Sequence, residues 1–151
     1  MGKGFNKKRY KGISMTKEKF VPRQFYSNYV KKAEEFYDTM ETAFQKQHWD
    51  VCVSSAIHTV ISILDAIAVQ QLGKRSSSQN HLQAVLLLND IKTHDENRKS
   101  NLKNGVMELI NLKTPSEYGE KLMSRAEAKK AMDICEKVYT FIVGEIKKGE
   151  I

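Results

Sequence analysis

Apolar side chains recur every three or four residues along most of this chain, the spacing that places them on one face of an α-helix. No glycine or proline interrupts residues 24–72, and the pattern predicts a first amphipathic helix over about 24–46. A second helix follows, with Asp50 as its expected N-cap and Gly73 as its C-terminal stop. Apolar residues cover most of its circumference, so it is expected to be the central helix.

The remaining part of the body has the same helical character after a polar loop at 74–80. A third helix is expected over about 81–91, and a fourth begins between residues 97 and 105 and is ended by Pro115. The fifth helix has a clear start, because Ser124 and Glu127 have the spacing of a capping box. No segment shows the alternation of a strand. The pattern therefore predicts an all-α fold, an antiparallel bundle of about five helices.

The net positive charge of the 151-residue chain comes entirely from its first 23 residues. Residues 1–23 hold eight Lys and Arg against Glu18, which gives 8 minus 1, or +7; the rest has 25 minus 8, or 17 bases, and 18 minus 1, or 17 acids. We interpret 1–23 as a flexible basic tail and 24–151 as one domain. The tail is either a solvated segment or an arm that contacts nucleic-acid phosphates, unless translation starts at Met15.

Composition removes several classes of protein. Cys52 and Cys135 lie in apolar segments far apart in the chain, which predicts buried free thiols and neither a disulfide framework nor a metal site. His48 and His94 fall in turns without partners at ligand spacing and are expected to be exposed. No uninterrupted apolar run approaches the ~20 residues of a membrane span, and no secretory signal is visible, so we expect a cytoplasmic protein without a membrane or cofactor.

The order of features resembles one known family. A Trp49-Asp50 turn precedes Ser-Ala-Ile-His-Thr-Val-Ile-Ser-Ile-Leu-Asp-Ala at 55–66; Leu-Gly-Lys-Arg at 72–75 and His81-Leu follow, and Leu-Lys-Thr-Pro-Ser-Glu-Tyr-Gly at 112–119 comes before the last helix. Over about 24–148 this is similar to the HEPN domain, the "higher eukaryote and prokaryote nucleotide-binding" family. The resemblance implies an antiparallel helical bundle that often dimerises. Some members are metal-independent ribonucleases of toxin-antitoxin or defence systems, and others are non-catalytic nucleotide-binding or scaffold modules.

The resemblance also directs attention to Arg75 and His81, because nuclease members have an arginine four to six residues ahead of a histidine. Cleavage of RNA by its own 2'-hydroxyl needs a proton-transfer group and a cation on the phosphate, and these two residues are the candidates. Lys74 and Ser78 are candidate RNA-binding neighbours. The pair lies before the third helix, whereas the family motif tends to lie late in the bundle. The alternative is that Arg75 is simply solvated.

A second group of candidates is the polar stripe of the second helix, Ser54 or Ser55, His58, Ser62 and Asp65. Steps of three and four put these side chains on one face, where Ser62 is expected to meet His58 and Asp65. The stripe faces a dimer partner or solvent, or else it lines a ligand pocket to which His58 contributes. Tyr118 either packs on the end of the bundle or stacks on a base.

Two function classes follow. The first is a HEPN-like protein, expected to be a homodimer, that binds or acts on RNA or a nucleotide, with His81 and Arg75 as the catalytic pair of an endoribonuclease. The second is a non-catalytic module that docks a partner such as a nucleotidyltransferase or an antitoxin.

Overall fold

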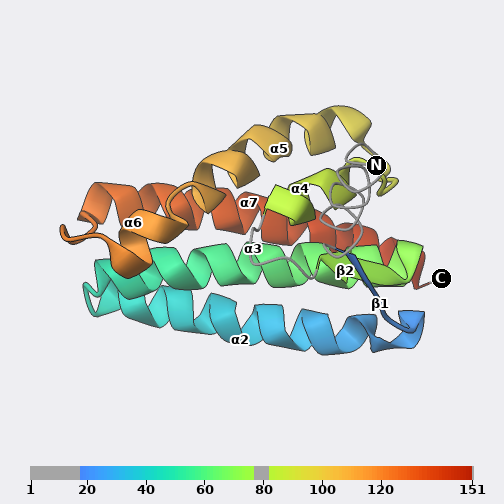
Figure 1. The fold of residues 1–151 in the computed structure, drawn as a ribbon, viewed down its shortest axis with the longest axis horizontal. Helices are drawn as coiled ribbons and strands as arrows, with labels where there is room; N and C mark the ends of the chain where they lie inside the picture. Colours follow the sequence, from blue (N-terminus) through green and yellow to red (C-terminus); the bar gives the residue numbers. More distant parts are fainter. Residues whose placement is uncertain (1–17, 77–81, 151) are drawn as a thin grey trace, which may run out of the picture.

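The computed structural model of the chain describes residues 18–76 and 82–150. Figure 1 shows α2, α3 and α7 as long rods lying side by side, with α5 packed at an angle on the α7 side and a small two-stranded sheet and α6 at opposite ends of α3. In chain order the elements are β1 (Glu18–Phe20), η1 (Arg23–Phe25), α2 (Tyr26–Gln45), α3 (Trp49–Leu72), β2 (Lys74–Ser76), α4 (Leu82–Leu88), α5 (Glu96–Ile110), α6 (Lys113–Tyr118) and α7 (Arg125–Gly149).

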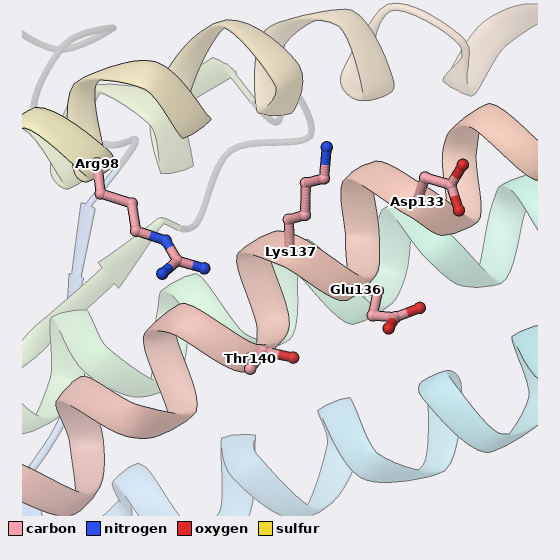
Figure 2. A pocket seen from close by; sticks show the side chains of 5 residues that line it. All are labelled: Arg98, Asp133, Glu136, Lys137 and Thr140. Carbon is pink, nitrogen blue, oxygen red and sulfur yellow. The ribbon is translucent and has the colours of Figure 1, made fainter.

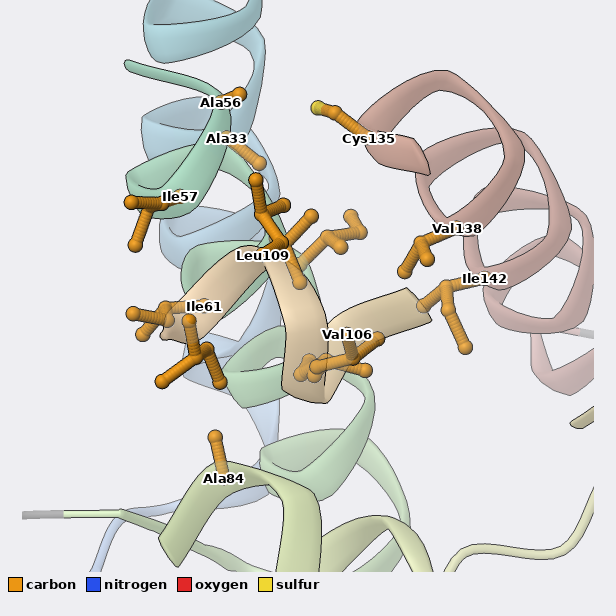
Figure 3. Close-up of a cluster of buried hydrophobic side chains, with 14 of the residues drawn as sticks. Ala33, Ala56, Ile57, Ile61, Ala84, Val106, Leu109, Cys135, Val138 and Ile142 are labelled. Carbon is orange, nitrogen blue, oxygen red and sulfur yellow. The ribbon is translucent and has the colours of Figure 1, made fainter. Parts of the chain in front are cut away.

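The second predicted helix, α3, is the centre of the core, as expected. It packs against both α2 and α7, and Ile57, Leu64 and Ile67 are at most 2% exposed. Figure 3 shows side chains of α2, α3, α4, α5 and α7 converging on this core. Among the described helices α3 alone is long and apolar enough to cross a membrane, but 72% of its most apolar window is buried inside the protein. Such burial is typical of the core helix of a helical bundle.

Several local predictions are confirmed. The all-α class is correct, and each of the five predicted helices has a counterpart, the fourth of them as two separate helices. Ser124 Oγ accepts a hydrogen bond from Glu127 N at 3.1 Å while Glu127 Oε1 accepts one from Ser124 N at 2.8 Å, which completes the capping box of α7. Gly73 ends α3 with φ 67°, a left-handed conformation that favours glycine.

The two cysteines are buried free thiols, as predicted. Burial raises the pKa of Cys52 to about 11 and that of Cys135 to about 12. Both thiols therefore stay protonated at neutral pH, and they act as small core side chains.

The predicted cap of α3 is wrong. The helix begins at Trp49, two residues earlier than an N-cap at Asp50 would place it, and Asp50 lies within its first turn. The Asp50 carboxylate instead accepts a hydrogen bond from Met123 N at 2.5 Å. It therefore ties the start of α3 to the loop before α7, a contact between residues 73 positions apart that local spacing does not reveal.

The fourth predicted helix is divided in two. α5 is capped by Asp95, whose carboxylate accepts a hydrogen bond from Arg98 N at 2.9 Å. It ends at Ile110, ahead of Pro115, and Pro115 lies in the separate short helix α6. Proline is tolerated there because the N–H groups of a first helical turn have no intrahelical acceptor.

The short sheet is the feature that sequence periodicity missed. Residues 74–76 were expected in a loop, but they form β2 and pair antiparallel with β1, with Glu18 opposite Ser76 and Lys19 opposite Arg75. Strands of three residues are too short to show alternation. Residues 18–20 and Arg23, which charge alone assigned to the basic tail, thus belong to β1 and the start of η1. The candidates Ser78 and His81 lie outside the described residues.

Candidate functional site

The end of α3 places Arg75 against the bundle. Gly73 turns the chain into β2, and Arg75 Nη1 donates a hydrogen bond to the carbonyl of Ser76 at 2.7 Å. The guanidinium carbon lies 5.8 Å from the centroid of the Tyr29 ring on α2. Arg75 is only half-buried, yet its Nε is enclosed and has no hydrogen-bond partner among the described residues. The guanidinium is thus held on the protein and is not a freely solvated charge.

Asp65 is the buried partner of this arginine. Its side chain belongs to a residue only 7% exposed, and one carboxylate oxygen accepts a long hydrogen bond from Ser76 N at 3.4 Å. Burial raises the pKa of Asp65 to about 7, against the lowering effects of the Arg75 charge, the Ser76 amide and the Lys32 charge. Asp65 is therefore partly protonated near neutral pH.

A second cation completes the group. Lys32 Nζ lies 5.3 Å from the centroid of the Tyr29 ring, so this ring has a cation from α2 and another from β2 close to it. We call Tyr29, Lys32, Asp65, Arg75 and Ser76 the Asp65 cluster. Because Asp65 carries only part of a negative charge, the two cations outweigh it.

His58 belongs to a different cluster, nearer the start of α3. Its ring stacks on Phe36 with centroids 5.1 Å apart, and its Nε2 lies 3.5 Å from Glu117 Oε1 on α6. Ser54 Oγ donates to the same oxygen at 3.2 Å, and Lys113 Nζ lies 2.9 Å from Glu117 Oε2. Burial raises the pKa of Glu117, but the hydrogen bond from Lys113, its charge and the Ser54 hydroxyl outweigh burial and lower the pKa overall.

Two expectations about these side chains are wrong. The hydrogen bonds expected from Ser62 to His58 and Asp65 do not form in the described part of the chain; Ser62 and Asp65 are buried under neighbouring elements and do not face solvent. Tyr118 does not pack on the bundle, since it is 75% exposed, with Lys113 Nζ 5.6 Å from its ring centroid.

His94 is exposed, as predicted, but it also makes a contact that the sequence did not indicate. Its side chain is 67% exposed, but Nδ1 lies 2.8 Å from Glu145 Oε1 on α7, and its backbone N donates to the same oxygen at 2.8 Å. Glu145 is almost fully buried, and its other oxygen lies 3.2 Å from Lys148 Nζ. This arrangement fastens the segment between α4 and α5 to α7.

The predicted site residues therefore divide between the two ends of α3. Lys74 and Arg75 lie on β2, just beyond the C-terminal end of α3. His58 lies nearer the start of α3, where it contacts α6, and Tyr118 is the last residue of α6. With a rise of 1.5 Å per residue, the helix separates the two groups by roughly 20 Å.

A mixed-charge pocket of about 360 Å³ lies elsewhere, between α5 and α7. Figure 2 shows Arg98 of α5 and Asp133, Glu136, Lys137 and Thr140 of α7 around it. It contains none of the predicted site residues. In the described ranges 18–76 and 82–150, no group of three His, Cys, Asp or Glu side chains is arranged to hold a metal ion.

A scan against protein-family models matches the HEPN domain over residues 26–147. The chain belongs to the HEPN family. A search of curated proteins finds no significant match. Membership establishes a nucleotide- or RNA-related module, in agreement with the resemblance carried by the sequence.

Three residues of these clusters were not singled out from the sequence. Tyr29 and Lys32 reach the Asp65 cluster from α2, and Glu117 reaches His58 from α6. Tyr29, Lys32 and Phe36 are spaced three and four residues apart, which places them on one face of α2. That spacing was available as a signal, but which helix this face meets is a tertiary property.

Proposed function

We propose that this HEPN protein binds RNA at the Asp65 cluster and cleaves it as a metal-independent endoribonuclease, with Arg75 and His81 as its catalytic pair. The observation that carries the proposal is the placement of the Arg75 guanidinium. Contacts with the Ser76 carbonyl and the Tyr29 ring hold the guanidinium in position. Asp65 lies close enough for the Arg75 charge to lower its pKa.

The charge of the cluster favours a phosphate ligand. Lys32 and Arg75 contribute two positive charges, and burial keeps Asp65 partly neutral near pH 7. A phosphodiester brings one negative charge and several acceptor oxygens, which a guanidinium binds well. Because Arg75 is already ordered on the protein, little side-chain entropy is lost when it binds the phosphate.

The proposed chemistry needs two groups. A histidine takes the proton of the 2'-hydroxyl or gives one to the departing 5'-oxygen, and His81 has the required spacing from Arg75 in the sequence. Arg75 stabilises the charge that develops on the phosphate oxygens as the new bond forms. We further propose that the acting form is a cytoplasmic homodimer within a toxin-antitoxin or defence system, in which two such pairs approach one phosphate.

The test is cleavage of a fluorescently labelled RNA in the presence of EDTA. We expect the wild-type protein to cleave, and His81→Ala and Arg75→Ala each to reduce the rate at least a hundredfold. His48→Ala is the matched control, because His48 is an exposed histidine at the opposite end of α3. Equal cleavage by all four proteins would contradict the catalytic assignment, and so would cleavage that EDTA abolishes.

One observation favours a second function, that of a non-catalytic interaction module. Val51, Tyr118 and Leu122 are 50%, 75% and 83% exposed, and Val51 and Leu122 line the same pocket near the start of α3. Exposed apolar side chains of this kind suit a protein interface, with a nucleotidyltransferase or an antitoxin as the partner. Co-purification with the product of a neighbouring gene, lost in Leu122→Glu and retained in Lys121→Glu, tests this function.

A further inference from the structure

We propose that the two-stranded sheet of β1 and β2, here called the β ribbon, binds single-stranded RNA and delivers it to the Asp65 cluster. This inference rests on the proposed function, since it names how the substrate reaches that site. It concerns residues of β1, Lys19 and Phe20, to which sequence reasoning gave no individual role.

The β ribbon presents an exposed aromatic ring on one face and cations on both faces. Lys19 and Phe20 of β1 are exposed, and the Phe20 side chain is among the most exposed of the large apolar residues, at 84%. The register places Phe20 opposite Lys74 and Lys19 opposite Arg75. Directly opposite residues of an antiparallel pair share one face of the sheet, and neighbours along a strand lie on opposite faces. Phe20 therefore shares its face with Lys74 and Glu18, whereas Lys19 and Arg75 lie on the other face.

The pairing of Lys19 with Arg75 has an electrostatic cost. Two like charges directly opposite each other destabilise a strand pair. In the described part of the chain, no carboxylate lies within 4.0 Å of Lys19, Arg23 or Arg75, and Asp65 is only partly charged. A phosphate chain that crosses the β ribbon would relieve this repulsion, because it brings one negative charge per nucleotide.

The segment that precedes β1 adds to the positive charge. It contains no Asp or Glu, and its six bases are Lys3, Lys7, Lys8, Arg9, Lys11 and Lys17. The segment joins the folded domain at Glu18, which pairs with Ser76 of the Asp65 cluster. A charge of +6 is therefore attached to the protein at the place where the proposed active site begins.

The combination favours a single strand over other anions. An isolated exposed phenylalanine is ordinary on a protein surface, but Phe20 lies directly opposite a lysine on a strand pair that carries two more cations on its other face, a composition found in single-strand binding sites. In such sites the bases stack on aromatic side chains while the backbone follows the positive charges. Duplex RNA keeps its bases paired and stacked, so it offers nothing to Phe20.

The experiment measures binding of the full-length protein to a fluorescein-labelled, 2'-O-methylated oligouridylate of twelve nucleotides, by anisotropy over a series of salt concentrations. The methylated strand lacks the 2'-hydroxyl nucleophile, so binding is measured without cleavage. We expect Phe20→Ala to weaken binding about five- to hundredfold with an unchanged salt dependence, because it removes one stacked base. We expect Lys19→Gln/Lys74→Gln to reduce the slope of log K against log salt by about 1.4, because two phosphate contacts are lost.

A matched control separates a specific site from a general loss of charge. Lys46→Gln/Lys121→Gln removes the same two charges from exposed positions outside the β ribbon. We expect it to leave the slope unchanged. Equal slopes for the two double variants would overturn the proposal. Binding of polyglutamate as tight as that of the oligonucleotide, unaffected by Phe20→Ala, would also overturn it and would indicate a general anion surface that acidic proteins can use.

Two measurements distinguish RNA binding by the β ribbon from the proposed nuclease activity. Cleavage of unmodified RNA by wild type and His81→Ala tests the nuclease, whereas binding of the methylated strand by wild type and the β-ribbon variants tests the β ribbon. Cleavage by wild-type protein together with binding that no β-ribbon variant weakens would refute the β ribbon and leave the nuclease. Binding through the β ribbon without cleavage would refute the nuclease and leave a single-strand-binding protein.

Discussion

Asp65→Asn tests the electrostatics of the Asp65 cluster directly. A buried acid with a raised pKa stabilises the folded protein below its unfolded pKa, and this contribution is lost as the pH rises through the folded pKa. For Asp65 the ordinary value is 3.8 and the folded value is about 7, so the loss falls between about pH 4 and pH 7. Asparagine has nearly the same shape, keeps an oxygen that can accept from Ser76 N, and never ionises.

The magnitude follows from the shift. A change of about three pKa units at 1.36 kcal/mol per unit corresponds to about 4 kcal/mol between fully protonated and fully ionised Asp65. Between pH 5 and pH 8 the change is about 2.5 kcal/mol, because part of the loss has already occurred at pH 5. The effects of Arg75 and Lys32 are contained in this shift, since both charges lower the pKa that burial raises.

The assay is urea unfolding of the wild-type and Asp65→Asn proteins at several pH values from 5 to 8. We expect Asp65→Asn to be more stable than the wild type at pH 8, with an advantage that shrinks by about 2.5 kcal/mol toward pH 5. The other ionisable groups are common to both proteins, so their contributions cancel in the difference. A stability difference that does not change with pH would show that Asp65 is ionised in the folded protein throughout and would refute the reasoning.

Two further predictions concern the bundle itself. Leu64→Ala should lower the free energy of unfolding by ~2 to 5 kcal/mol, because Leu64 is 2% exposed in the central helix, whereas Val51→Ala at a half-exposed position of the same helix should lower it by less than ~1 kcal/mol; urea denaturation compares them. Burial raises the pKa of Glu145, but hydrogen bonds from His94 and Lys148 outweigh burial and lower the pKa overall. The contribution of ionised Glu145 to the stability of the folded protein is therefore lost as the pH falls. Glu145→Gln should therefore cost ~1.5 to 3 kcal/mol at pH 7 and less at pH 4, and an equal cost at both pH values would contradict this.

Sequence patterns were sufficient for the bundle because its signals are local. Helical periodicity located α2, α3 and α7, and Ser124 with Glu127 fixed the start of α7, because the capping box depends on residues three positions apart. Asp50 shows where such reasoning fails. Its carboxylate suits a cap, but the competing acceptor role toward Met123 N depends on the approach of a distant loop.

The candidate site was predictable only in part, for the same reason. Arg75 was found from its spacing to His81, and Asp65 from its place on the polar stripe. That these two residues influence each other follows from the turn at Gly73, which brings β2 back against α3, and from the pairing of β2 with β1. A strand of three residues leaves no periodic signal, so neither the Asp65 cluster nor the β ribbon is visible before the chain is folded.

The unfavourable burial of polar groups in the Asp65 cluster indicates that the cluster has a functional role. Burying a carboxyl group, and enclosing Arg75 Nε and Ser76 Oγ without partners in the described residues, are arrangements that cost stability. If such a polar group had no role beyond packing, its substitution would raise stability without any loss of function. If Asp65 serves to hold Arg75 for a phosphate, Asp65→Asn should unfold at higher urea concentration at pH 8 and yet cleave or bind RNA more weakly, the trade expected of a functional site. A variant that gained stability and kept full RNA activity would show that the cluster has no part in function.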